Sequence, residues 1–299
     1  MSNKIPMTKA LLWIFLSTLV VSGSATLGWL YYLHVIHERA SDEDYTIKAI
    51  VQSGPEGQQL PTEYLAEVLG VSANYPQNLY AYDLVEGKKA LLRSPLIKSA
   101  ILKRARPDAL YVEYTVCQPV ARLGDYYNIA IDEEGSLFPY KPFFDDRPLP
   151  ELFLGLTAFG TAEGGSWNEP ITGERYQLAC VILKTLRSQK HFEGMAIERV
   201  DVSKAFAGSC GQREIVVQVE DVQEKFIRGE PVKCYMPKTL RLTAEGWRDE
   251  LKNYKVLRSY LCAKELDEKV EVNRSQVTLP ITVVDMRLPQ LAFLNEYRR

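Results

Sequence analysis

Residues 94–116, SPLIKSAILKRARPDALYVEYTV, decide the fold of the region that contains them. Leu96–Arg104 is predicted to form a strand, Pro107-Asp108 a turn and Leu110–Val116 a second strand, in which buried and exposed positions alternate. Ser94-Pro95 ends the element before them, because the residue before a proline is pushed out of the α region. The stretch therefore predicts a strand pair that follows a helix.

The residues before this stretch complete a small module. Tyr45–Val51 (YTIKAIV) is predicted to be a strand and Thr62–Leu69 a short helix. Asp83–Arg93 is predicted to be a second helix, opened by a D-x-x-E capping box. The predicted order within residues 45–118 is strand, helix, helix, strand, strand.

An uncharged run precedes the module. Ala10–Leu33, ALLWIFLSTLVVSGSATLGWLYYL, would span about 36 Å as a helix, against about 30 Å of membrane hydrocarbon. Trp29, Tyr31 and Tyr32 stand at its end, where aromatic rings favour the membrane interface. We therefore expect a tail at 1–9, a transmembrane helix at 10–33 and a linker at 34–44.

The charges beside this run set its orientation. Lys4 and Lys9 come before it, and the acidic residues Glu38, Asp42, Glu43 and Asp44 come after it. The positive-inside rule places the N-terminus in the cytoplasm and the rest of the chain outside. Cleavage as a signal peptide after Ala25 is the alternative. Cleavage would also place the downstream chain outside the cytoplasm. The apolar run, however, continues past the end of an ordinary signal peptide.

The remaining chain predicts a second domain at 119–294 and a frayed tail at 295–299. Short strands lead to a helix from Thr172 to about Ser188, and further strands lead to a helix capped by Thr243. A long strand, Pro280–Leu288, comes near the end. The predicted fold class is α+β: a single transmembrane helix, the small module, and a mixed α/β domain built on an antiparallel-rich sheet.

Composition and motifs give no sign of an enzyme. The 299 residues carry a formal net charge of -2, which offers no general attraction to nucleic acid. The sequence contains no HExxH, GxSxG, P-loop or GxGxxG motif, so we expect no catalytic, cofactor or metal residues. Five scattered cysteines without a CxxC leave one or two disulfides open: Cys117, Cys180, Cys210, Cys234 and Cys262.

Several short blocks resemble the FtsQ/DivIB family of bacterial cell division proteins. The blocks are Ser94-Pro95-Leu96-Ile97 with Ala100-Ile101, Arg104 with Pro107, Pro119-Val120-Ala121-Arg122, Asp132 with Gly135 and Phe138, Leu149-Pro150-Glu151-Leu152, and Val284-Asp285-Met286-Arg287. The chain departs from the family pattern at Val116 and Cys117, where the family usually has Glu-Arg. It departs again at Leu288–Leu291, where the family has an aromatic residue and then a glycine.

The resemblance implies a POTRA domain at 45–118 and the family's β-domain at 119–294. It implies a non-catalytic scaffold of the divisome, in the bacterial inner membrane at the division site, with its bulk in the periplasm. The implied partners are FtsB-like and FtsL-like proteins, with no small-molecule substrate.

We expect the partner to add a strand to an open sheet edge. The predicted edge is Pro280–Leu288, which prolines bracket. Arg287 would pair with an acidic residue of the partner. The expected partner-binding residues are Val284, Met286, Arg287, Leu288 and Leu291. The alternative is a core strand in which Asp285 and Arg287 pair internally.

Two other functions stay open at this point. POTRA domains also act as periplasmic chaperone or translocation modules, but the sequence shows neither tandem modules nor a barrel pattern. A membrane-anchored cell-wall enzyme is less well supported, because no catalytic group stands out.

Overall fold

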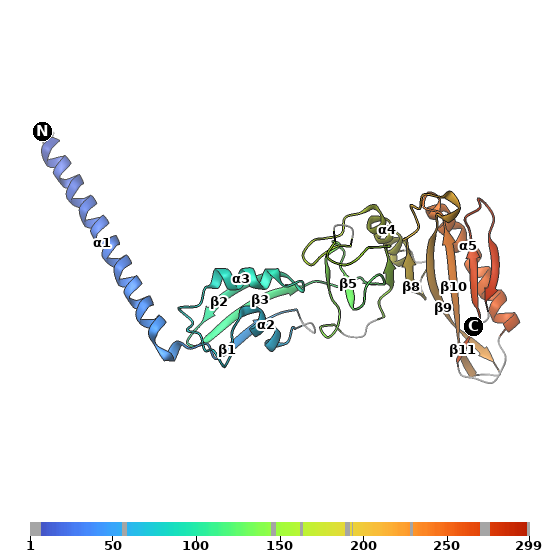
Figure 1. Ribbon diagram of the computed structural model, residues 1–299, viewed down its shortest axis with the longest axis horizontal. Coiled ribbons are helices and arrows are strands. Elements are labelled where there is room, and N and C mark those ends of the chain that lie inside the picture. The colour runs from blue at the N-terminus through green and yellow to red at the C-terminus, as the bar shows by residue number, and fades with distance from the viewer. Residues whose placement is uncertain are drawn as a thin grey trace, which may run out of the picture. The chain divides into compact units, whose positions relative to one another are not determined.

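The computed structural model describes residues 7–55, 59–144, 148–161, 164–188, 192, 194–227, 230–269 and 276–297 (Figure 1). The chain divides into two compact units, Met1–Val116 and Cys117–Arg299. Residues 1–6 of the expected cytoplasmic tail lie outside the described residues.

The first unit begins with a single long helix, α1 (Met7–Ser41). Its segment Leu11–Ser41 is long and apolar enough to cross a membrane, and the large apolar side chains from Leu11 to Leu33 are exposed. The helix continues to Ser41, so most of the expected linker at 34–44 is helical. His34–Ser41 contains neither glycine nor proline, so nothing in that segment breaks the helix.

The small module has the predicted order of elements. Its strands are β1 (Ala49–Ser53), β2 (Ile97–Ala105) and β3 (Ala109–Val116), and its helices are α2 (Thr62–Leu69) and α3 (Leu84–Arg93). The sheet order is β1-β3-β2, with β3 parallel to β1 and antiparallel to β2. The predicted capping of α3 is confirmed, because the Asp83 carboxylate accepts hydrogen bonds from the backbone N–H groups of Val85 and Glu86.

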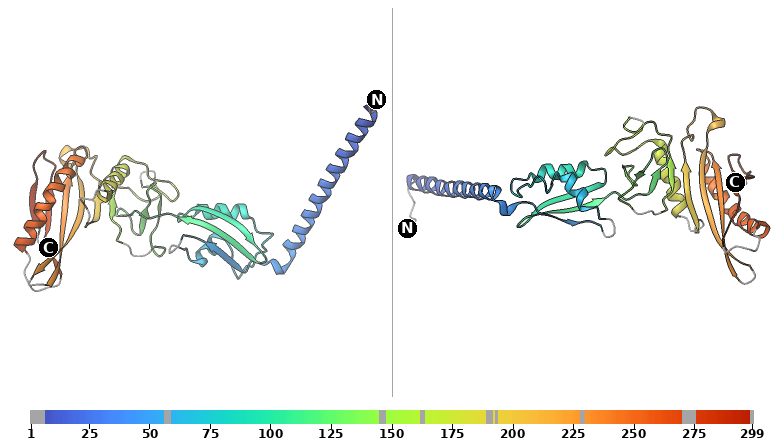
Figure 2. Two further views of the ribbon diagram at one scale, coloured as in Figure 1. Left: turned by 180° about the vertical axis from the view of Figure 1, so that it is seen from behind. Right: turned by 60° about the horizontal axis from the view of Figure 1, so that its bottom comes forward.

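The second unit is built on one mixed sheet (Figure 2). Its strand order is β13-β12-β10-β9-β8-β7-β4-β5-β6, and β11 pairs with β10. The strands are β4 (Ala121–Leu123), β5 (Ile129–Ile131), β6 (Leu137–Pro139), β7 (Glu151–Phe153), β8 (Met195–Asp201), β9 (Ile215–Ile227), β10 (Glu230–Leu242), β11 (Gln276–Thr278), β12 (Ile281–Asp285) and β13 (Phe293–Tyr297).

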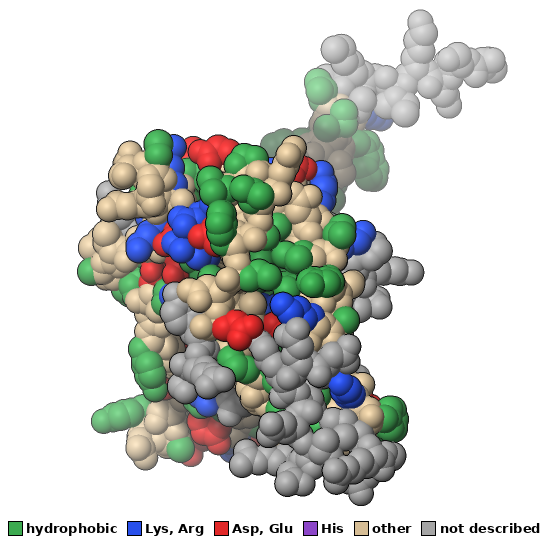
Figure 3. All heavy atoms as spheres, turned by 90° about the vertical axis from the view of Figure 1, so that its right-hand side faces the viewer, with side chains coloured by type: hydrophobic (Ala, Val, Ile, Leu, Met, Phe, Trp, Pro, Cys, Tyr) green, Lys and Arg blue, Asp and Glu red, His purple; other side chains and the backbone are tan. Residues whose placement is uncertain are grey.

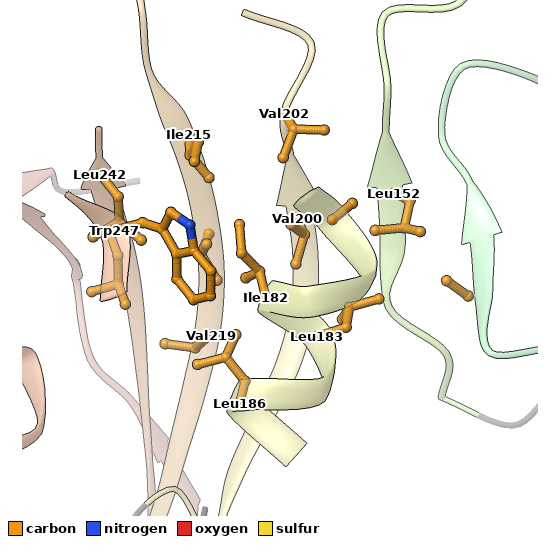
Figure 4. Packing of buried hydrophobic residues seen from close by; sticks show 14 of the residues in the cluster. Leu152, Ile182, Leu183, Leu186, Val200, Val202, Ile215, Val219, Leu242 and Trp247 are labelled. Carbon is orange, nitrogen blue, oxygen red and sulfur yellow. The ribbon is translucent and has the colours of Figure 1, made fainter. Parts of the chain in front are cut away.

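Two helices of this unit, α4 (Glu174–Ser188) and α5 (Trp247–Lys269), bury their apolar side chains in the same core as the sheet. Figure 4 shows Ile182 and Leu186 of α4 facing Val200, Val219 and Trp247. The sheet contributes Ile215, Val217 and Val219 from β9 and Leu240 and Leu242 from β10 to this core. The full α+β organisation matches the predicted fold class.

Buried charges join α5 to the sheet. Lys238 of β10 is fully enclosed, and its Nζ lies 3.2 Å from Oδ2 of Asp221 and 3.4 Å from Oε2 of Glu265. Arg258 of α5 donates through Nε to Oδ1 of Asp221 at 2.8 Å. The Thr282 hydroxyl donates to Glu265 at 2.7 Å. Two cations and two carboxylates thus balance in a largely buried region, in which the Arg258 side chain keeps 13 % exposure.

The C-terminal strands differ from their prediction. The expected long strand Pro280–Leu288 ends at Asp285, because the carboxylate of Asp285 accepts the backbone N–H of Arg287 and a turn follows. Leu291 N–H donates to Leu288 C=O within that turn. Part of the expected tail at 295–299 belongs to β13, which runs to Tyr297, and residues 298–299 lie outside the described residues.

Candidate protein-docking edge

The strand predicted to be the open edge is an interior strand. β12 pairs with β10 on one side, from Thr282 to Asp285, and with β13 on the other, from Ile281 to Asp285. The expectation that Pro280–Leu288 forms the edge was therefore wrong. Within the part of the chain that the structure describes, β13 ends the sheet and has a strand neighbour on one side.

The ladder pattern shows which backbone groups of β13 point outward. The Met286 N–H donates to the Arg241 C=O of β10. Because the backbone groups of successive residues in a strand point to opposite sides, the even-numbered residues of β12 direct their N–H and C=O groups toward β10 and the odd-numbered ones toward β13. Asp285 is paired with Phe293, and Val283 with Asn295. Phe293 and Asn295 therefore direct their backbone groups toward β12. The N–H and C=O of Leu294, which lies between them, point away from the sheet.

The side chains of β13 alternate between the two faces of the sheet. Leu294 lies opposite Val284, so both side chains point to the face that α5 covers. Phe293 lies opposite Asp285 and points to the other face. The Leu294 side chain is 47 % exposed, which leaves an apolar surface beside an outward-facing backbone.

An apolar groove adjoins this edge. It has a volume of about 760 Å³ and lies between α5 and the turn that joins β12 to β13. Its exposed apolar lining consists of Val256 and Tyr260 from α5, and Leu288 and Leu291 from the turn. Figure 3 shows hydrophobic and charged side chains interspersed on the side of the molecule that lies at the right of Figure 1. The edge and the groove together form the candidate docking site.

The expected partner-binding residues fall into two groups. Val284 and Met286 are buried beneath α5 with 0 % and 4 % exposure, and Met286 contributes to the inner lining of the groove. Leu288 and Leu291 are 52 % and 58 % exposed and line the groove. Alternation in the sequence placed Val284, Met286 and Leu288 on one side, but it could not show that a helix covers that side only as far as Met286.

Arg287 is held within its own chain. Its guanidinium donates to both carboxylate oxygens of Asp285, at 2.9 and 2.7 Å. Arg241 and Glu214 extend this group, with Arg241 Nη1 lying 3.2 Å from Asp285 Oδ2. The structure thus has the internal Asp285–Arg287 pair and not a guanidinium that awaits a partner. Hydrogen bonding from Arg287 lowers the pKa of Asp285 and raises that of Arg287.

The lowered pKa of Asp285 makes a prediction about stability at low pH. A carboxylate whose pKa is lower in the folded than in the unfolded chain adds stability above the unfolded value of about 3.9, and this stability is lost as pH falls. We expect Asp285→Asn to cost about 1–2 kcal/mol at pH 7 and less at pH 3. Thermal unfolding of both proteins between pH 3 and 7 measures this difference, and a constant difference would contradict it.

The described residues contain no group of three or more His, Cys, Asp or Glu side chains that could hold a metal ion. None of the five cysteines, all of which are described, forms a disulfide. Burial raises the pKa of the Cys262 thiol to about 11 and also raises the pKa of Cys180 and Cys234.

Comparison with known proteins gives two similar relatives. The cell division protein FtsQ of Neisseria meningitidis serogroup B is 35% identical over 89 residues, which are 30% of this chain and 33% of the relative. FtsQ of Neisseria gonorrhoeae is also 35% identical over 89 residues, or 32% of its length. Over this segment the chain is FtsQ-like. The match spans about one third of the length of these curated relatives, and no family model matches the sequence.

Proposed function

We propose that this protein is a bitopic membrane scaffold of the bacterial divisome, which recruits an FtsB/FtsL-like complex through β13. The similarity to FtsQ supports a role in cell division. The apolar helix α1 supports a membrane anchor. The observation that carries the docking mode is the outward-facing backbone of Leu294 beside an apolar groove.

Strand addition accounts for both affinity and selectivity at this site. An incoming strand would hydrogen-bond to the outward N–H and C=O of Leu294, as strands do at exposed sheet edges. Every second side chain of that strand would lie on the α5 face, above Leu294 and next to Val256 and Tyr260. The partner is therefore expected to present alternating apolar side chains there, and these anchors would carry most of the binding energy.

The anchor contributes to binding without touching the partner. We propose that the N-terminus is cytoplasmic, that a POTRA-like domain (45–118) and a β-domain (119–294) lie in the periplasm, and that the protein concentrates at the division site. A single-pass helix confines the docking edge to a thin layer beside the membrane. Partners with their own anchors then meet it at a high effective concentration. The role needs no catalytic group.

Charge placed in the groove tests this function. Leu288→Glu and Leu291→Glu are expected to abolish co-purification with the FtsB-like partner and to leave the fold intact, because both side chains are already exposed. Val85→Glu, an exposed apolar position in α3, is the matched control and should bind normally. Unchanged co-purification of both groove variants would remove the groove from the docking site.

Fluorescence microscopy tests the wider role independently of the docking mode. A fusion of the full chain should concentrate at midcell during division, and a fusion that ends after α1 should not. Uniform membrane fluorescence of the full chain would contradict a divisome scaffold, whatever the groove variants show.

A further inference from the structure

The C-terminal end of α1 is capped by a side chain of the small module. The last carbonyl groups of a helix have no partner within the helix. Here the Asn78 amide donates from Nδ2 to the C=O of Arg39 and to the C=O of Asp42, both at 2.8 Å. The same amide accepts the Tyr80 N–H through Oδ1 at 2.8 Å. One asparagine thus ties the end of the apolar helix to the loop that precedes α3.

Aromatic and cationic side chains close the same junction. The Arg39 guanidinium lies 5.4 Å from the centre of the Tyr80 ring, and its Nη1 donates to the Tyr80 hydroxyl at 3.3 Å. The Tyr45 ring meets Tyr80 edge to face at 5.1 Å. Arg104 of β2 lies 5.7 Å from the Tyr80 ring, and its Nε donates to Leu79 C=O. Contacts of this kind hold ring and cation in a fixed geometry.

The backbone between α1 and β1 is also paired. The N–H groups of Asp44, Tyr45, Thr46, Ile47 and Lys48 each donate a hydrogen bond. Ile47 N–H reaches Gln77 C=O, and Leu79 N–H returns to Tyr45 C=O. A hinge needs residues whose backbone can change conformation at little cost. Asp44, Tyr45 and Thr46 are held in a local turn, while Ile47 and Lys48 donate to Gln77 and Asp108 of the module, so bending here would break hydrogen bonds and the segment is a poor hinge.

We propose that Arg39, Tyr45, Asn78, Tyr80 and Arg104 form a junction clamp that locks α1 to the small module. Rotation or tilt of the membrane helix is then passed directly to the module. A rigid, packed junction transmits such motion, whereas a flexible linker would absorb it. This property is independent of the docking edge and of the partner that binds there.

Distance measurements test the clamp in the full chain in lipid nanodiscs. Spin labels would be placed at Leu30→Cys in α1 and Ile101→Cys in β2, with Cys180 and Cys210 changed to serine so that they are not labelled. The unaltered junction should give one narrow distance distribution, and Asn78→Ala and Arg39→Gln should each broaden it at least about twofold. Gln77→Ala is the control, because that side chain donates to the C=O of Gly70 within the module.

Arg39→Gln keeps this experiment decisive, since it changes the helix and not the core of the module. A distribution in the unaltered protein that is as broad as in both variants would overturn the clamp. Proteolysis gives a second measurement. Trypsin should cleave after Arg39 at least about tenfold faster in Asn78→Ala than in the Gln77→Ala control, because cleavage follows local opening. Equal cleavage rates would also overturn it.

Discussion

Replacing Leu294 with proline is expected to abolish binding of the proposed FtsB-like partner while the fold remains. The Leu294 N–H points away from β12, so the substitution removes no hydrogen bond within the sheet. Proline is tolerated at an edge position whose N–H faces solvent. An incoming strand would lose a backbone donor and meet the proline ring. We expect affinity to fall at least about 100-fold, measured by calorimetry with the purified partner.

A series at this one position separates the backbone contribution from that of the side chain. Leu294→Val keeps the N–H and most of the apolar surface and should bind almost normally. Leu294→Ala keeps the N–H but loses part of that surface, so its affinity should fall about tenfold. If the proline variant bound as tightly as the alanine variant, strand addition at β13 would be excluded. Circular dichroism and thermal unfolding of each variant verify that the sheet is intact.

Among the substitutions proposed for this protein, Lys238→Met should cause the largest loss of folding stability. The ammonium group is fully buried and neutralises Asp221 and Glu265, so the variant leaves one net negative charge in the core. Breaking a buried ion pair by removing one partner costs about 3–5 kcal/mol, against a total stability of about 5–15 kcal/mol. The melting temperature of the second unit should fall by about 10 °C.

Two further variants show whether charge balance is the cause. Lys252→Met removes an exposed lysine that pairs with Asp249 on the same helix and should cost less than about 1 kcal/mol. Glu265→Gln, combined with Lys238→Met, restores the balance of charge and should recover part of the loss. If the double variant were no more stable than Lys238→Met, cavity and packing effects would account for the loss instead.

Short-range signals predicted the small module well. The strand alternation at Leu110–Val116, the cap at Asp83 and the break at Ser94-Pro95 are all local features, and the structure contains each of them. The membrane-length helix was equally clear from its uncharged run. Its continuation to Ser41 is not apparent from the sequence, because the residues that follow the apolar run are mostly polar.

The docking edge could not be found in the same way. Pairing between strands depends on residues far apart in the sequence, and β13 is only five residues long. Its partner strand β12 has the stronger alternation, which predicts a strand but does not show that strands pair with it on both sides. One missed feature did leave a signal. Lys238 and Asp221 occupy inward positions of alternating strands, where all the other inward residues from Val232 to Leu242 are apolar.

The position of β10 has a consequence for how this unit comes apart. β10 is bonded to β9 along its whole length and to β11 and β12 on its other side, whereas among the described residues β13 pairs with β12 alone. Fraying should therefore start at β13 and peel inward. A partner strand bound to β13 would oppose this local unfolding. Loss of the partner would therefore make this protein easier for proteases to digest.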